Sequence, residues 1–141
     1  MVPLIKCLAY IAKIFSYSWY MNLIERALKL LGVKFLGKPD YIDLNVIVDA
    51  SGGLTLGDNI VISTNVVILS YDKLFDQRMP VYIGDDTFVG AKVSILPGTT
   101  IGKCCIIGAG AVVSGVVEDY SIMAGNPAKK IGDTRHGSCP E

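Results

Sequence analysis

The sequence predicts an all-β solenoid, because aliphatic residues recur at every sixth position through most of the chain. The longest unbroken run of this period is Ile83, Val89, Ile95, Ile101, Ile107 and Val113. Small or polar residues follow most of these positions, and a second apolar or small residue comes four places on. A six-residue unit is too short for a helix pair or a hairpin, but it fits one short strand with a turn. We therefore expect stacked coils with the six-residue positions pointing inward.

The same period extends upstream, with one interruption. It predicts as inward residues Leu44, Ala50, Leu56, Ile62 and Ile68. Ile83 then follows Ile68 by fifteen residues, where twelve would keep the phase. The excess predicts a loop over about residues 70–82 that leaves the solenoid, and such loops often carry function. We expect the solenoid domain to span residues 44–132, with a tail over 133–141.

The segment before the solenoid, residues 1–43, has a different pattern. Apolar residues spaced by three and four between residues 3 and 32 predict one or two amphipathic helices, followed by a linker. One interpretation is a cap on the open end of the solenoid. The other is peripheral membrane contact through residues 3–32, with basic residues at the headgroups. No uncharged run reaches the ~18 residues of a membrane span.

Composition limits the classes of partner and metal. The 141 residues contain 13 Lys and Arg and 13 Asp and Glu, so no basic excess is available to bind nucleic acid. The four cysteines include no CxxC pair, and His136 is the single histidine, so we expect no metal site. This cysteine usage favours the cytoplasm, with membrane association as the alternative if the N-terminal helix lies on a bilayer.

A longer motif carries a family resemblance. The run IGDDTFVGAKVSILPGTTIGKCCIIGAGAVVSGVVEDYSIMAGNPAKKIG, from Ile83 to Gly132, resembles the hexapeptide-repeat acyltransferases. It is most similar to the maltose, galactoside and xenobiotic acetyltransferases and to sugar acetyltransferases of surface-polysaccharide gene clusters. The resemblance implies a left-handed parallel β-helix with three hexapeptides per coil. It also implies a homotrimer that binds acetyl-coenzyme A (acetyl-CoA) between subunits.

Small residues fall into columns if three hexapeptides make one coil. Gly90 lies eighteen residues before Gly108, and Ala91 eighteen before Ala109, so each pair would stack. The resemblance places coenzyme A contacts at the alanines, at Ser114 and at Lys129. Lys130, the neighbour of Lys129, could serve the same role, because lysine binds phosphate as a point charge. The alternative is that the small residues only satisfy corner geometry and that the lysines are solvated. The candidate cofactor-binding residues are Gly90, Ala91, Gly108, Ala109, Ser114, Lys129 and Lys130.

The catalytic position departs from the family pattern. The resemblance implies a histidine base in the stretch that corresponds to residues 68–73, but Tyr71 stands at that position and Asp72 follows it. Three interpretations remain open. Asp72 could be the base, Tyr71 could orient an acceptor amine that is already neutral, or the chain could bind without turnover.

The functions implied are therefore two. The first is an acetyl-CoA-dependent O- or N-acetyltransferase that acts on a sugar or similar small acceptor, in surface-polysaccharide biosynthesis. The second is a coenzyme A- or sugar-binding or assembly protein of the same fold, in which Tyr71 has replaced the base.

Overall fold

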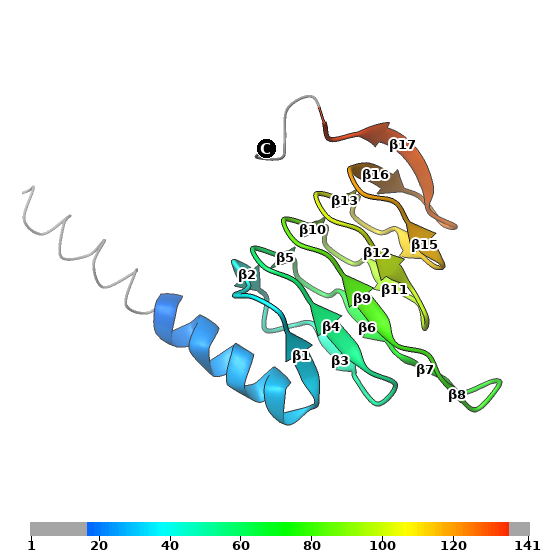
Figure 1. Ribbon diagram of the computed structural model, residues 1–141. Helices are drawn as coiled ribbons and strands as arrows, with labels where there is room; N and C mark the ends of the chain where they lie inside the picture. The colour runs from blue at the N-terminus through cyan, green and yellow to red at the C-terminus, as the bar shows by residue number, and fades with distance from the viewer. Residues whose placement is uncertain (1–16, 136–141) are drawn as a thin grey trace, which may run out of the picture.

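A three-sided parallel β-solenoid with one helix at its N-terminal end makes up the described part of the chain (Figure 1). The computed structural model describes residues 17–135. Each coil contributes one short strand to each of three sheets, which form the three faces. The predicted all-β solenoid is confirmed.

The three faces are built from strands that return at every coil. The first face consists of β1 (Val33–Phe35), β4 (Leu54–Leu56), β9 (Val81–Ile83), β12 (Thr100–Ile101) and β15 (Val116–Val117). The second face consists of β2 (Tyr41–Ile42), β5 (Val61–Ile62), β10 (Phe88–Val89), β13 (Ile106–Ile107), β16 (Ser121–Ala124) and β17 (Lys129–Asp133). The third face consists of β3 (Ile47–Asp49), β6 (Val67–Leu69), β11 (Ser94–Ile95) and β14 (Val112–Val113). All pairs in these sheets are parallel except β16 with β17.

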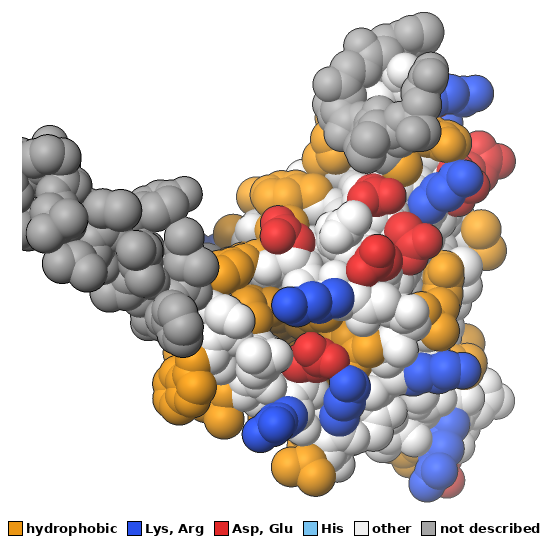
Figure 2. All heavy atoms as spheres, turned by 60° about the vertical axis from the view of Figure 1, so that its left-hand side comes forward, with side chains coloured by type: hydrophobic (Ala, Val, Ile, Leu, Met, Phe, Trp, Pro, Cys, Tyr) orange, Lys and Arg blue, Asp and Glu red, His pale blue; other side chains and the backbone are white. Residues whose placement is uncertain are grey.

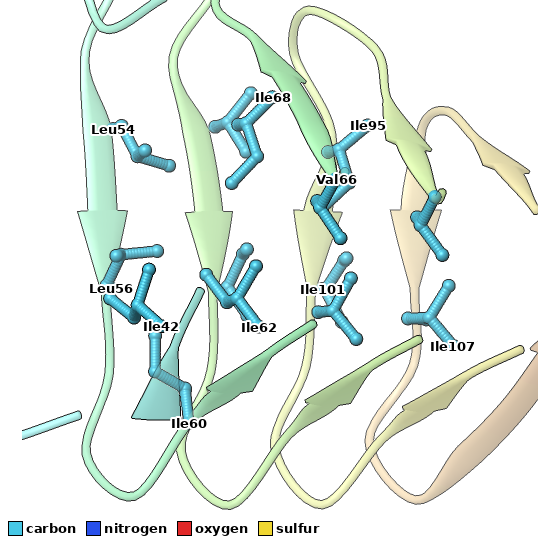
Figure 3. Packing of buried hydrophobic residues seen from close by; sticks show 14 of the residues in the cluster. Ile42, Leu54, Leu56, Ile60, Ile62, Val66, Ile68, Ile95, Ile101 and Ile107 are labelled. Atoms are coloured by element: carbon cyan, nitrogen blue, oxygen red, sulfur yellow. The ribbon is translucent and has the colours of Figure 1, made fainter. Parts of the chain in front are cut away.

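The register stacks identical positions of successive coils. Ile83 pairs with Ile101, Val89 with Ile107 and Ile95 with Val113, so these coils are eighteen residues long. All six side chains are fully buried. Aliphatic side chains of neighbouring coils pack on one another inside the solenoid (Figure 3). Each contributes about 1.5–3 kcal/mol by leaving water, so the repeated column supplies the core.

The corners between faces use a left-handed backbone conformation. In each regular coil a second residue points inward four places after the aliphatic one, and the residue just before it lies at a corner and has a positive φ. These residues are Asn59, Asn65, Asp86, Lys92, Gly98, Cys104 and Gly110. Glycine, asparagine and aspartate tolerate this conformation better than other residues, which accounts for much of their use here. Lys92, at φ 59°, is an exposed exception.

The first coils depart from the predicted phase. Leu44 is 69% exposed and Ala50 is only partly buried, so the prediction that both point inward is wrong. Their places are taken by Ile42, which pairs with Ile62, and Val48. Ile42 and its partner Ile62 are twenty residues apart, whereas partners in a regular coil are eighteen apart. The two additional residues lie at the glycine-containing corner after β3, and they shift the phase of the residues before that corner.

The predicted loop is a hairpin of two short antiparallel strands, β7 (Tyr71–Asp72) and β8 (Gln77–Arg78). Leu56 pairs with Ile83 across 27 residues, whereas the regular coil has eighteen, so the hairpin adds nine residues. Ile68 and Ile83 lie on successive faces. The expected twelve-residue spacing between them is therefore wrong: one hexapeptide step carries a nine-residue insertion.

The helix, residues 17–30, covers the N-terminal end of the solenoid. Met21 and Ile24 are buried in the core cluster, and the Tyr20 hydroxyl donates to the Ile42 carbonyl at 3.1 Å. This is the packing predicted for a cap. The remainder of the predicted helical segment before residue 17 and His136 lie outside the described residues. Between residues 17 and 135, no helix is long and apolar enough to cross a membrane.

Candidate functional site

A groove lies where the β7–β8 hairpin leaves the third face. It has a volume of about 680 Å³ and is lined by Asp49, Leu69, Tyr71, Asp72, Lys73, Leu74, Leu96 and Pro97. A second hollow of about 550 Å³ is lined by Ser51, Tyr71, Asp76 and Arg78. Tyr71 lines both of these hollows.

Ser70 anchors the hairpin to the coil below. Its buried hydroxyl donates to the Asp49 carbonyl at 2.7 Å and accepts from the Gly52 amide at 2.8 Å. Its carbonyl accepts from the Met79 amide at 2.8 Å. A Cβ on Gly52 would lie 1.7 Å from that carbonyl oxygen, so only glycine fits there. The base of the hairpin is therefore held from both sides, which fixes where Tyr71 emerges.

Tyr71 is held by the hairpin that it begins. It pairs with Arg78 across the two strands, and its hydroxyl donates to the Asp76 carboxylate. This hydrogen bond stabilises the neutral phenol and, with a smaller effect of desolvation, raises the pKa of Tyr71 above its usual 10; Arg78 opposes the rise. Tyr71 is therefore protonated at neutral pH, and it can orient a ligand but cannot accept a proton from one.

Asp72 closes the hairpin tip. Its Oδ1 accepts from the Leu74 amide at 2.8 Å and from the Phe75 amide at 3.3 Å, an Asx-type turn. The carboxylate also lines the groove. One oxygen is thus engaged by the backbone, and Asp72 combines a position beside the groove with a turn-forming role.

Two polar residues of the site, Asp76 and Arg78, were not among the predicted site residues. They become neighbours of Tyr71 only through antiparallel pairing, which a loop of undefined shape does not indicate. The available signal is the pair of polar dipeptides, Tyr71-Asp72 and Gln77-Arg78, on either side of a four-residue turn.

The predicted column of small residues is confirmed as a feature of the fold. The Gly90 amide donates to the Ile107 carbonyl at 2.8 Å, which places Gly90 and Ala91 beside Gly108 and Ala109. A Cβ on Gly90 would lie 2.7 Å from the Ala109 nitrogen. These four residues, which we call the Gly-Ala corner, form the edge between the second and third faces.

The GNPA turn, residues 125–128, adds to the same edge. The Val112 amide donates to the Gly125 carbonyl at 3.0 Å, and the Ala128 amide to the Val112 carbonyl at 2.9 Å. The chain then enters β17, where Lys129 and Lys130 are exposed. Lys130 Nζ lies 3.7 Å from an Asp133 carboxylate oxygen.

Ser114 lies at the opposite edge of the third face. It is exposed and follows β14, whereas the hairpin follows β6 of the same sheet. The third face is thus bordered by the Gly-Ala corner and the GNPA turn on one side, and by Ser114 and the hairpin on the other. The structure places most of the predicted residues along the borders of the third face, whereas Lys129 and Lys130 lie on β17 of the second face, and it does not bring all of them into one pocket.

The electrostatics of the groove centre on Asp49 and Lys73. Hydrogen bonds from Ser51 lower the pKa of Asp49, and the nearby charge of Lys73 lowers it further. The Ser51 amide donates to Asp49 Oδ1 at 3.0 Å. Asp49 is therefore a negative charge across the physiological pH range, and it lines the groove together with the basic Lys73.

Comparisons with known proteins match the repeats. A family model described as bacterial transferase hexapeptide (six repeats) matches residues 80–115, and one described as hexapeptide repeat of succinyl-transferase matches residues 44–70. A protein of Mycobacterium tuberculosis named a probable acetyltransferase is 38% identical over 120 residues, covering 63% of this chain and 40% of that protein. The chain spans less than two thirds of the length of the curated relatives that it matches first.

Two solved structures are similar over most of the chain. A maltose O-acetyltransferase from Clostridium difficile is 29% identical, with a TM-score of 0.53 over 74% of this chain and 58% of that one. A galactoside acetyltransferase in complex with coenzyme A is 25% identical, with a TM-score of 0.56 over 79% and 72% of the two chains.

Proposed function

The chain carries the hexapeptide repeats of transferases over residues 44–70 and 80–115, and from this premise we propose that it transfers an acetyl group from acetyl-CoA to a small acceptor. The acceptor group is a hydroxyl or an amine, and a sugar is the expected acceptor. Surface-polysaccharide biosynthesis is the setting that the resemblance suggests. The similar galactoside enzyme is named as a coenzyme A complex, which supports the choice of cosubstrate.

The observation that carries the proposal is the Gly-Ala corner beside the third face. A pantetheine arm is long and thin, and it needs a track with small side chains and accessible backbone groups. Ala109 is exposed and Ala91 is partly so, and each is followed at its corner by an exposed residue, Gly110 and Lys92 respectively. The arm lies along this edge and brings the thioester toward the third face.

The phosphates of the cosubstrate bind at the lysines after the GNPA turn. Lys129 is exposed, and within residues 17–135 it makes no ion pair, whereas Lys130 is paired with Asp133. An unpaired ammonium group binds a phosphate without first breaking an ion pair, whereas a paired one loses the interaction with its carboxylate. Lys129 is therefore the main phosphate partner, with Lys130 as the second.

The proposed assembly is a homotrimer with the site between subunits. The hairpin projects from the body of the solenoid (Figure 1), and at its tip Leu74 is 83% exposed and Phe75 is 67% exposed. Large apolar side chains at the end of a projecting hairpin are stabilised by a neighbouring surface. In the trimer, each hairpin reaches across to the adjacent subunit and closes a groove along its Gly-Ala corner.

In the reaction, the acceptor nitrogen or oxygen attacks the thioester carbon, the carbon–sulfur bond breaks, and coenzyme A leaves as its thiol. An amine that is neutral at the outset needs no base before attack, and the proton it sheds afterwards passes to the leaving thiolate. Tyr71 orients such an acceptor. For a hydroxyl acceptor, Asp72 is the candidate base. Because Asp72 also forms the turn through its carboxylate, it is a poor base, and amines, which need no base, are the preferred acceptors.

The alternative is a protein of this fold that binds coenzyme A or a sugar without turnover. Two observations favour it: Tyr71 occupies the expected histidine position, and its hydroxyl is committed to Asp76. Fold alone does not establish activity.

Two measurements separate these functions. Calorimetry with coenzyme A tests binding: we expect a saturable heat, and none at millimolar ligand would refute the cofactor assignment. Release of free thiol from acetyl-CoA is then followed across a panel of amino and hydroxyl sugars. Thiol release with an amino sugar supports the transferase. Binding of coenzyme A without thiol release in the presence of any sugar of the panel supports the alternative.

Variants assign the roles of the two hairpin residues. If the missing base limits the rate, Tyr71→His gains activity toward hydroxyl acceptors, whereas the matched Tyr71→Phe does not. If Asp72 is the base, Asp72→Asn abolishes that activity, and an unchanged rate removes it from the mechanism.

A further inference from the structure

The N-terminal helix has two apolar sides, of which the solenoid uses one. Met21 and Ile24 face the core, at 4% and 7% exposure. On the opposite side stand Trp19, Leu23 and Leu30, which are 69%, 51% and 89% exposed. Their separations of four and seven residues align them along the helix. We call Trp19, Leu23 and Leu30 the outer stripe.

Basic and polar groups are placed within and beside the outer stripe. Arg26 is exposed and lies three residues after Leu23 and four before Leu30, so it emerges between them. A hollow of about 290 Å³ is lined by Trp19, Asn22, Leu23 and Arg26, which combines an aromatic ring, an alkyl chain and two hydrogen-bond donors. A lipid phosphate with its adjoining chains presents the matching chemistry.

The surroundings of the helix are more basic than acidic. Exposed Lys34 and Lys38 lie in the segment from the helix to the first coil, together with Lys29, which is paired with Glu25 at 2.6 Å. The other acids of this segment are the exposed Asp40 and the half-buried Asp43. Figure 2 shows basic side chains on the lower part of the molecule, with apolar side chains beside them and an acidic one among them. The whole chain has no net charge, so this excess is local.

We infer that the outer stripe docks on an anionic lipid surface, with the helix lying in the plane of the membrane. The apolar side chains enter the boundary between headgroups and acyl chains, and Arg26 extends to the phosphates. A second copy of the chain is a poorer occupant, because a symmetric contact through the stripe would place two Arg26 side chains against each other. This inference does not depend on acyl transfer.

The test uses the full-length protein and its intrinsic fluorescence, because Trp19 is the only tryptophan in the chain. Vesicles of phosphatidylcholine mixed with phosphatidylglycerol are titrated in, and the protein is also floated with them. We expect a blue shift of the emission, quenching by lipids brominated on their acyl chains, and co-flotation that weakens with salt. Vesicles of phosphatidylcholine alone bind at least tenfold less.

Variants identify the surface. Leu23→Glu with Leu30→Glu lowers partitioning at least tenfold, and Arg26→Gln lowers it about fivefold. The control is Val116→Glu on the first face, which changes a side chain of similar exposure (79%) and leaves partitioning unchanged. Unchanged circular dichroism shows that the variants are folded.

Three outcomes overturn the inference. One is the absence of any emission shift or flotation with anionic vesicles. Another is an emission shift that follows protein concentration without lipid, which assigns the stripe to a second copy. The third is a Trp19 emission that is already blue-shifted and shielded from soluble quenchers in the free protein, which means that another part of the chain covers it.

Discussion

The left-handed corners allow a pair of opposite substitutions to be predicted in sign and size. Lys92 and Gly110 occupy the same corner position in adjacent coils, at φ 59° and 72°. Lys92→Gly should stabilise the fold, and Gly110→Ala should destabilise it. An added Cβ at Gly110 meets nothing within 4 Å, so the second change tests backbone conformation alone.

The magnitude follows from two opposing effects. A non-glycine residue in the left-handed region costs about 1–2 kcal/mol. Glycine, however, lowers the stability by about 0.4–1 kcal/mol, because it increases the conformational entropy of the unfolded chain. The difference leaves about 1 kcal/mol in favour of glycine at both positions. For a chain of this size, that shifts the melting temperature by about 3 °C, upward for Lys92→Gly and downward for Gly110→Ala.

The assay is thermal unfolding at one fixed protein concentration, because assembly would make the melting temperature depend on concentration. Asn65→Gly is the matched control: Asn65 has φ 57° at an exposed corner, and asparagine already tolerates that conformation, so its melting temperature should change little. A lower melting temperature for Lys92→Gly, or a higher one for Gly110→Ala, would refute the reasoning.

Three further predictions concern the core, the hairpin anchor and pH. Ile95→Ala should cost about 2–5 kcal/mol and Ile95→Val about 1 kcal/mol by chemical denaturation, because Ile95 is fully buried between two coils; equal losses would contradict a close-packed column. Ser70→Ala should cost about 1–3 kcal/mol by the same measurement, because it leaves the Gly52 amide without its partner; a loss of a few tenths would mean that water replaces the hydroxyl. The hydrogen bond to Asp43 raises the pKa of Tyr41 to about 12, so its contribution to stability is complete below the unfolded value near pH 10 and is lost between pH 10 and 12. Melting temperatures of Tyr41→Phe should therefore fall less than those of the native protein over that range, and parallel curves would exclude this linkage.

Much of the fold follows from the sequence because one rule is repeated. From Ile83 to Val113, period and burial coincide at each position. The rule fails at Leu44 and Ala50, since a corner with two additional residues shifts the phase and the hydrophobic pattern alone does not register it. Ile42 and Val48 are equally apolar, so both phases satisfy the pattern locally.

The candidate site is less predictable because it depends on contacts across the inserted hairpin. The Gly-Ala corner follows from the coil length, which the sequence contains. The contact of Tyr71 with Asp76 and Arg78 depends on the pairing of β7 with β8, which a nine-residue insertion does not specify. The role of Asp72 is also not predictable from the sequence, because its turn-forming hydrogen bonds exist only in the folded hairpin tip.

A crystal structure with coenzyme A bound tests the central claim most directly. We predict the pantetheine arm along Ala91 and Ala109, a phosphate at Lys129, and the thiol in a groove closed by a Tyr71 hairpin. Coenzyme A seated on another face, or an empty Gly-Ala corner in crystals grown at a concentration that saturates the protein in solution, would contradict it.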